Sequence, residues 1–481
     1  MRRIKLHMKL KHFDLEINKD DPFQGCCTGR KKAGETLTRI IDNIEMGCTI
    51  SLTGEWGSGK TTFLRMWRQD LINNRFPTVL LNAWKTEWAE DPLIAVLSCM
   101  LDVINKSDDG SKQAIESVKK IVSSFIKKPL PVLGEVINTV IDATTGVDLK
   151  GVSDSLKKLS SEAFDEAVKD FNSREESLDK LKKSIEAFAW DVNQGDSDTK
   201  PLVFIIDELD RCRPDYSVRL LEVLKHFFEV KNIVYVCAID KKHMEDAIRG
   251  YYGSENINAT EYLRRFFDLE VELPAPDYGV FCKHLYEYYN LGAFFDSPLR
   301  RSAYFYNTGG EVFISSLVSL ASRGNLNLRQ VERICAYTKL SLEGEPVNIY
   351  YYPMLSLILT YLRFFDYSFY QDLKEHKLSA QEILTQFETK YAFLIDPKED
   401  DNQRNNRYEM AFYIGKLISS YIRDNHNNEV FFDDQKKETP LKSRVFSEEE
   451  INNMFGRVAS GQNFYQLNWL FSILDILKIE G

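Results

Sequence analysis

A glycine-rich octapeptide constrains the fold of this chain more than any other part of its sequence. Residues 54–61 read GEWGSGKT and match the pattern G-x-x-x-x-G-K-[ST] without a mismatch. The β-rich run 47–54 leads into it, and residues 60–74 place apolar side chains at helical intervals. A short buried strand that turns through glycines into a helix is typical of a parallel sheet covered by helices.

Residues 54–61, here called the glycine loop, combine the residue types that hold a phosphate chain. Glycines let successive N–H groups point inward, and the start of the next helix adds partial positive charge. We expect Lys60 to neutralise the β- and γ-phosphates of a nucleotide and Thr61 to ligate Mg²⁺. The alternative is a glycine turn with a surface lysine. The predicted nucleotide-binding residues are Gly54, Glu55, Trp56, Gly57, Ser58, Gly59, Lys60, Thr61 and Thr62.

An acidic pair supplies the second half of the predicted site. Asp207 and Glu208 follow the apolar run 202–206, whose composition indicates a buried strand. We expect Asp207 to join Thr61 in holding Mg²⁺ and Glu208 to polarise the attacking water as a base. The alternative is an ordinary turn at the end of a strand.

A long segment separates the glycine loop from the acidic pair, although one strand–helix–strand unit needs only ~30 residues. Residues 106–195 are rich in charged residues and contain the break KKPLPVLG. We interpret them as an inserted helical module that contacts a partner and is dispensable for nucleotide binding. Contact with a membrane surface is the lesser option, through the lysines Lys119, Lys120, Lys127 and Lys128.

Composition excludes several other classes of protein. Acidic residues outnumber basic ones 72 to 62, for a net charge of −10, which argues against a general nucleic-acid-binding surface. The eight cysteines are scattered without a C-x-x-C pair, as in the reduced core of a cytoplasmic protein. No apolar stretch reaches the ~20 residues of a spanning helix, and the N-terminus lacks the features of a secretory signal. We therefore expect a cytoplasmic protein without a transmembrane span.

Beyond these motifs, residues 20–340 together resemble the KAP family of P-loop NTPases. The segments that carry the resemblance occur in the family's order: GEWGSGKTTF (54–63), LLNAW (80–84), IIDELDRC (205–212), VYVCAIDKKHMEDAI (234–248), YLRRFFDLEVELP (262–274) and GNLNLRQVERI (324–334). The family implies an α/β fold, an additional-strand P-loop NTPase core that binds ATP and Mg²⁺. In its parallel sheet one strand lies between those that precede the glycine loop and the acidic pair. An all-helical C-terminal subdomain follows the core.

The resemblance and the change of sequence pattern near residue 278 divide the chain into regions. We expect an N-terminal arm at 1–29 and a P-loop core with its insertion at 30–277. A helical lid at 278–345 and a C-terminal helical region at 346–481 should follow. Many relatives carry transmembrane helices in the insertion, but here the insertion is not apolar enough. The aromatic run 348–370 is interpreted as a buried helical core rather than a surface that stacks nucleic-acid bases.

The resemblance also implies roles for residues outside the two motifs. Asp240 matches a γ-phosphate sensor at a strand end, and it fits equally well as the N-cap of a helix that begins at Lys241. Arg329 matches a lid arginine that reaches the γ-phosphate, with a solvated helix residue as the alternative. With Lys60 and Glu208, these two residues complete the predicted catalytic set.

Two further features of the family have less defined roles. Arg264 and Arg265 stand where related oligomeric ATPases place an arginine finger, and pairing with Glu261 or Asp268 is the alternative. The segment 82–84, Asn-Ala-Trp, has no assigned function. We interpret its tryptophan as a core residue rather than a platform for a ligand.

Together these features predict an ATPase that converts ATP and water into ADP and phosphate to drive a conformational switch. Bacterial relatives of this type often belong to antiphage systems, so a role in antiviral defence is implied by the resemblance alone. The alternatives are a P-loop kinase of a small-molecule acceptor and an ATP-binding scaffold with negligible turnover. The expected partner is an unidentified protein; a homo-oligomer and contact with nucleic acid stay open.

Overall fold

The fold is that of a computed structural model, which describes residues 17–44, 46–88, 91–96, 98–99, 179, 182–183, 186, 200–296, 309–343, 353–392, 401–424, 432–433, 435–459 and 467–476. Internal contacts divide the chain into two units. The sheet unit comprises residues 16–24 and 30–274, and the helical unit comprises residues 1–15, 25–29 and 275–481. Each is described by itself.

A five-stranded parallel sheet forms the centre of the sheet unit, with the strand order β2-β3-β4-β1-β5. Its strands are β1 (Cys48–Thr53), β2 (Thr78–Asn82), β3 (Leu202–Asp207), β4 (Ile233–Ile239) and β5 (Leu269–Glu272). Strand β4 pairs with both β1 and β3, which confirms the predicted additional strand. Every residue of β1, β3 and β4 is buried, as expected for inner strands covered on both faces.

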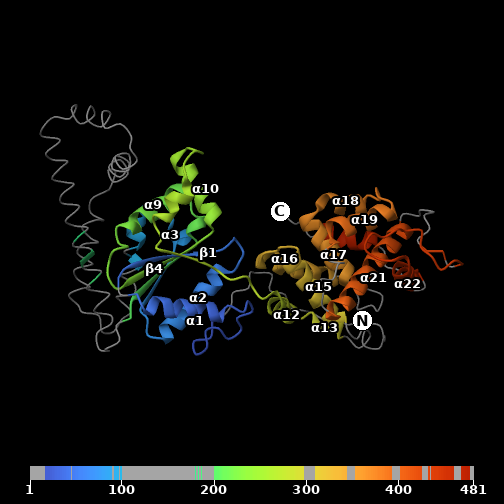
Figure 1. The fold of residues 1–481 in the computed structure, drawn as a ribbon, viewed down its shortest axis with the longest axis horizontal. Coiled ribbons are helices and arrows are strands. Elements are labelled where there is room, and N and C mark those ends of the chain that lie inside the picture. Colours follow the sequence, from blue (N-terminus) through green and yellow to red (C-terminus); the bar gives the residue numbers. More distant parts are fainter. Residues whose placement is uncertain are drawn as a thin grey trace. The chain divides into compact units, whose positions relative to one another are not determined.

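Helices cover both faces of this sheet. They are α1 (Lys31–Asp42), α2 (Lys60–Asn73), α3 (Ala83–Thr86), the 3-10 helix η1 (Leu209–Arg211), α9 (Pro214–Lys225), α10 (Lys241–Tyr252) and α11 (Ala259–Arg264). Figure 1 shows α1 and α2 on one side of the strands and α9 and α10 on the other. Phe204 and Ile206 of β3 share a buried cluster with Leu220 of α9 and Met244 of α10. Val203 and Ile205, which alternate with them, are also buried but lie outside that cluster, so the side chains of β3 are buried on both faces of the sheet.

The helical unit packs around one large apolar cluster. Its helices are α12 (Tyr278–Tyr288), α13 (Gly292–Phe295), α15 (Gly309–Arg323), α16 (Leu328–Glu343), α17 (Pro353–Phe365), α18 (Tyr367–Lys374), α19 (Ala380–Lys390), α21 (Asp401–Asp424), α22 (Glu448–Ala459) and α23 (Leu467–Ile476). The α/β core followed by a helical region confirms the predicted fold class.

Burial confirms the interpretation of the aromatic run at 348–370 for most of its described part, although Phe365 and Tyr367 are 38% and 57% exposed. Within it, residues 354–362 of α17 are all buried, and Phe369 and Tyr370 of α18 are at most 1% exposed. The predicted insertion at 106–195 lies outside the described residues, apart from four helical positions. Among the helices that the structure describes, none combines the length and the apolar character needed to cross a membrane.

Candidate nucleotide site

The glycine loop has backbone angles that glycine adopts most readily. Gly57 and Gly59 have φ values of 81° and 90°, in the left-handed region that strains residues with a Cβ atom. Gly59 is the N-cap of α2, so Lys60 is the first helical residue. A Cβ atom at Gly54 would lie 2.9 Å from the Ser58 hydroxyl. The loop therefore closes tightly just before a helix N-terminus, an arrangement that favours an anion.

Contacts of Ser58 fix one side of the loop and leave one polar group available. Its carbonyl accepts a hydrogen bond of 2.6 Å from the buried Arg30, which also donates to the carbonyl of Pro274 at 2.8 Å. The Ser58 hydroxyl is buried and has no partner in the described part of the chain. A ligand rich in acceptor oxygens would satisfy it. Sequence reasoning missed Arg30 because its partners are backbone carbonyls 28 and 244 positions away.

Lys60 directs its ammonium group into the glycine loop. Its Nζ atom donates to the carbonyl of Gly54 at 2.6 Å and to that of Glu55 at 3.3 Å. The Oδ2 atom of Asp210 lies 3.4 Å from the same nitrogen, and Lys60 is only 9% exposed. The lysine is thus held inside the loop, where it can meet phosphate oxygens.

Thr61 and Asp207 meet as the sequence predicts. The Thr61 hydroxyl donates to Asp207 Oδ1 at 3.3 Å, although the two residues are 146 positions apart. Asp207 is 4% exposed, and burial, helped by the charge of Glu208, raises the pKa of its carboxyl to about 6. A divalent cation would stabilise the charged form. These two hard oxygen donors beside an anion-binding loop fit a nucleotide-bound Mg²⁺.

Replacing Asp207 by Asn should stabilise the protein in the absence of Mg²⁺ and nucleotide. The raised pKa means that ionised Asp207 costs free energy in the folded state, by about 3 kcal/mol above pH ~6 and less below it. The amide oxygen of the asparagine would keep an acceptor for Thr61 and for the N–H of Glu208, which both donate to Oδ1. Urea unfolding in EDTA should show a gain of ~1–3 kcal/mol at about pH 7.5, roughly halved at about pH 5. A loss of stability at neutral pH would contradict this account.

Glu208 is restrained by contacts to both carboxylate oxygens. Asn82 donates from Nδ2 to Oε2 at 2.8 Å, and an Arg211 guanidinium nitrogen lies 2.8 Å from Oε1. The backbone of Glu208 has a φ of 61°, a strained conformation for a residue that is not glycine. Asn82 had no assigned role in the sequence, and Arg211 was not singled out. The contact of Asn82 joins two neighbouring strands across 126 positions and leaves no local sequence signal, whereas Arg211 is only three positions from Glu208.

Asp240 is the N-cap of α10, which is one of the two roles that the sequence left open. It follows β4 and caps α10, because its carboxylate accepts from the N–H groups of Lys242 at 3.1 Å and His243 at 3.3 Å. The same carboxylate accepts from the N–H of Trp56 at 2.9 Å. Asp240 thus joins α10 directly to the glycine loop. A contact with the γ-phosphate stays a prediction.

The interpretation of Trp84 as a core residue is wrong. Its side chain is 51% exposed, and the Arg211 guanidinium lies 5.8 Å from the centre of its ring. The reason is the short helix α3, which Asn82 caps by accepting from the N–H of Lys85 at 2.9 Å. This cap starts the helix one residue before Trp84, and only Ala83 of the helix is buried.

The candidate arginines are placed differently from one another. Arg264, at the end of α11, lies 3.6 Å from Glu261 with both side chains exposed, a contact of little energetic value. Asp268 instead accepts from the backbone N–H and the hydroxyl of Thr49. Arg265 is exposed. Arg329 lies in the first turn of α16, in the helical unit, so its contact with a nucleotide stays a prediction.

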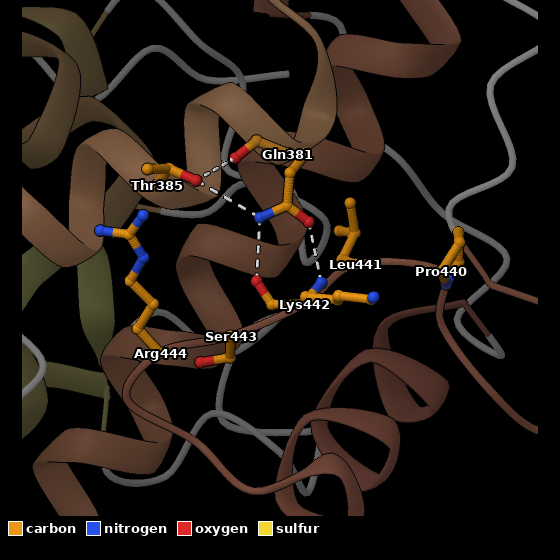
Figure 2. A pocket seen from close by; sticks show the side chains of 7 residues that line it. All are labelled: Gln381, Thr385, Pro440, Leu441, Lys442, Ser443 and Arg444. Carbon is orange, nitrogen blue, oxygen red and sulfur yellow. Dashed lines mark hydrogen bonds between the residues drawn. The ribbon is translucent and has the colours of Figure 1, made fainter.

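A cavity of about 690 Å³ lies in the helical unit and contains none of the predicted site residues. Figure 2 shows the amide of Gln381 between Thr385 and the backbone of Lys442. These bonds tie the loop at 440–444 to α19, so the polar groups at its centre already bind one another. The residues that line the cavity are Gln381, Thr385, Pro440, Leu441, Lys442, Ser443 and Arg444.

Comparison with solved structures finds distant likenesses. An Aeropyrum pernix ORC2 protein in ADPNP–ADP complexes is 12% identical, with 89% of this chain and 93% of that chain covered and a TM-score of 0.32. Drosophila ORC bound to DNA is 14% identical, with 94% of this chain and 86% of that chain covered and a TM-score of 0.34. The Aeropyrum pernix ORC1 protein in complex with DNA is 8% identical, with 93% of this chain and 92% of that chain covered and a TM-score of 0.31. At these TM-scores the likeness says nothing about function. Among curated proteins, none gives a significant match.

The comparison with protein families gives a definite result. A model described as the KAP family P-loop domain matches residues 30–288. The match spans more than half of the chain and contains the glycine loop, the acidic pair and all five strands. It confirms the resemblance seen in the sequence motifs. The chain therefore belongs to the KAP family of P-loop proteins.

Proposed function

We propose that this chain binds ATP with Mg²⁺ at the glycine loop and hydrolyses it to ADP and phosphate. The observation that carries the proposal is the meeting of three elements at one edge of the sheet. These are the loop around Lys60, the oxygen pair of Thr61 and Asp207, and the restrained carboxylate of Glu208. Membership of a P-loop family supports nucleotide binding, and turnover is the further step that we propose.

Each group has a distinct task in this reaction. The loop N–H groups and Lys60 bind phosphate oxygens, and Lys60 exchanges its bond to the Gly54 carbonyl for a phosphate. Bound Mg²⁺, held through Thr61 and Asp207, would neutralise part of the phosphate charge. Glu208 accepts a proton from the attacking water, because each carboxylate oxygen keeps a lone pair beyond its contact with Asn82 or Arg211.

We propose that ATP binding and hydrolysis change the conformation of the chain, and that a partner protein in the cytoplasm recognises this change. Asp240 supports a link between nucleotide and fold, because it bonds the loop at Trp56 and caps α10. In the helical unit, Arg329 would respond to the γ-phosphate from the start of α16. A role in bacterial antiviral defence rests on the family resemblance alone.

The switch can be tested by replacing Arg329 with Ala. If Arg329 binds the γ-phosphate, ATP affinity should fall by about 1.5–3 kcal/mol, or roughly 10- to 150-fold, with ADP affinity nearly unchanged. Isothermal titration with both nucleotides measures this difference. Arg333→Ala is the matched control, because Arg333 is also exposed on α16, one turn further along. Equal losses for ADP and ATP, or no loss for either, would reject the role of Arg329.

A further inference from the structure

A buried carboxylate faces the loop lysine from the segment that follows the acidic pair. The Asp210 side chain is 2% exposed, and its Oδ2 atom lies 3.4 Å from Lys60 Nζ. The same oxygen accepts hydrogen bonds from the indole N–H of Trp56 at 3.0 Å and from the backbone N–H of Asp240 at 2.6 Å. One oxygen therefore connects the glycine loop, the first residue of α2 and the end of β4.

Trp56 is held in place although it lies on the surface. Its side chain is 41% exposed, so burial alone does not fix it. One bond goes from the indole to Asp210, and the backbone N–H donates to Asp240 at 2.9 Å. The ring also stacks on His243, with ring centres 3.7 Å apart and planes 18° from parallel. Residues that follow β3 and β4, namely Asp210 in η1 and Asp240 at the start of α10, thus hold the glycine loop in place.

In this arrangement, an incoming phosphate competes with Asp210 for the ammonium group of Lys60. Lys60 already has an anionic neighbour in Asp210 and a close carbonyl in Gly54. A phosphate that takes the ammonium group brings its negative charge close to that of Asp210, in a place with little solvent to screen it. The repulsion grows with the charge of the phosphate chain. A like charge at such a distance shifts a binding or ionisation equilibrium by about tenfold or more.

We propose that Asp210 is a positioning residue that holds Lys60 and Trp56 in the glycine loop, and that its charge lowers the affinity for nucleotides. The inference rests on the proposed nucleotide site and deepens it. Asp210 keeps the loop formed before the nucleotide arrives, while phosphate must displace it from Lys60. The negative charge of Asp210 therefore favours the release of the nucleotide as well as the ordering of the glycine loop.

The test is Asp210→Asn, which removes the charge and keeps the shape. The amide oxygen can still accept from Trp56 and from the N–H of Asp240, because both donate to a single oxygen in the wild type. Titration in EDTA should show ATP binding about tenfold tighter or more. The gain should be smaller for ADP and smaller again for AMP. A residue with only a structural role would not give an effect graded by phosphate charge.

Asp215→Asn is the matched control, because Asp215 is 52% exposed on α9 and lies 3.9 Å from Arg213; its affinities should stay within about twofold of wild type. Equal or weaker ATP binding by Asp210→Asn would overturn the inference while leaving the nucleotide site intact. If wild type and variant both fail to bind ATP even when Mg²⁺ replaces the EDTA, the proposed function itself fails. If Asp210→Asn does not fold, Asp210→Ser, which also removes the charge, is judged by the same criterion.

Discussion

Glu208→Gln should slow ATP hydrolysis by about 10²- to 10⁴-fold while leaving ATP affinity within a few-fold of wild type. Amide and carboxylate have nearly the same size, and the amide oxygen can still accept from Asn82, as Oε2 of Glu208 does. The amide cannot take the proton of the attacking water. Phosphate release under saturating Mg²⁺ and ATP measures the loss, and equilibrium titration measures the affinity.

A matched control for this variant is Glu87→Gln. Glu87 is also largely buried in the sheet unit, with 17% of its side chain exposed, and its carboxylate accepts from the backbone and side chain of Arg213. It has no place in the proposed reaction, so turnover should change by no more than about twofold. If Glu208→Gln turns over within a few-fold of wild type, the base is another residue.

Lys60→Ala should reduce ATP affinity by more than ~100-fold, because charge-assisted bonds to phosphate are worth about 1.5–3 kcal/mol each. Lys60 is the only formally positive residue of the glycine loop. The change also leaves Asp210 without its cation, which adds repulsion of the phosphates. Titration with ATP and Mg²⁺, on protein whose fold is checked by circular dichroism, measures the loss.

Lys241→Ala provides the comparison for Lys60→Ala. Lys241 lies at the start of α10 and pairs at 2.7 Å with Glu270, with both side chains partly exposed. Removing it changes the net charge by the same amount outside the loop, so ATP affinity should stay close to wild type. A folded Lys60→Ala variant that binds ATP as tightly as wild type would remove the glycine loop as the nucleotide site.

The sequence predicted the parts of the site that lie in continuous motifs. The glycine loop and the acidic pair are local patterns whose backbone and strand context follow from the same few residues. The additional strand and the helical region followed from the family resemblance and from the change in periodicity. Thr61 and Asp207 then meet because each stands at the carboxyl end of a parallel strand or at the start of the following helix.

The contacts that restrain these groups could not be predicted in this way. Asn82 and Glu208 are 126 positions apart, and Trp56 and Asp210 are 154 apart. Such pairs arise only when the strand order brings the loops together, and a polar residue in a loop has many potential partners. For Trp84, by contrast, a prediction was made and was wrong. Its apolar ring predicted burial, but the helix that begins at Ala83 leaves it exposed.

The most direct test of ATP hydrolysis at this site is to supply ATP and Mg²⁺ in water labelled with heavy oxygen and to analyse the products by mass spectrometry. Hydrolysis predicts free phosphate that carries solvent oxygen, at a rate that Lys60→Ala abolishes and Glu208→Gln greatly lowers. Two results would contradict the account: phosphate transferred to an acceptor without solvent oxygen, or labelled phosphate formed equally fast by the Lys60→Ala variant.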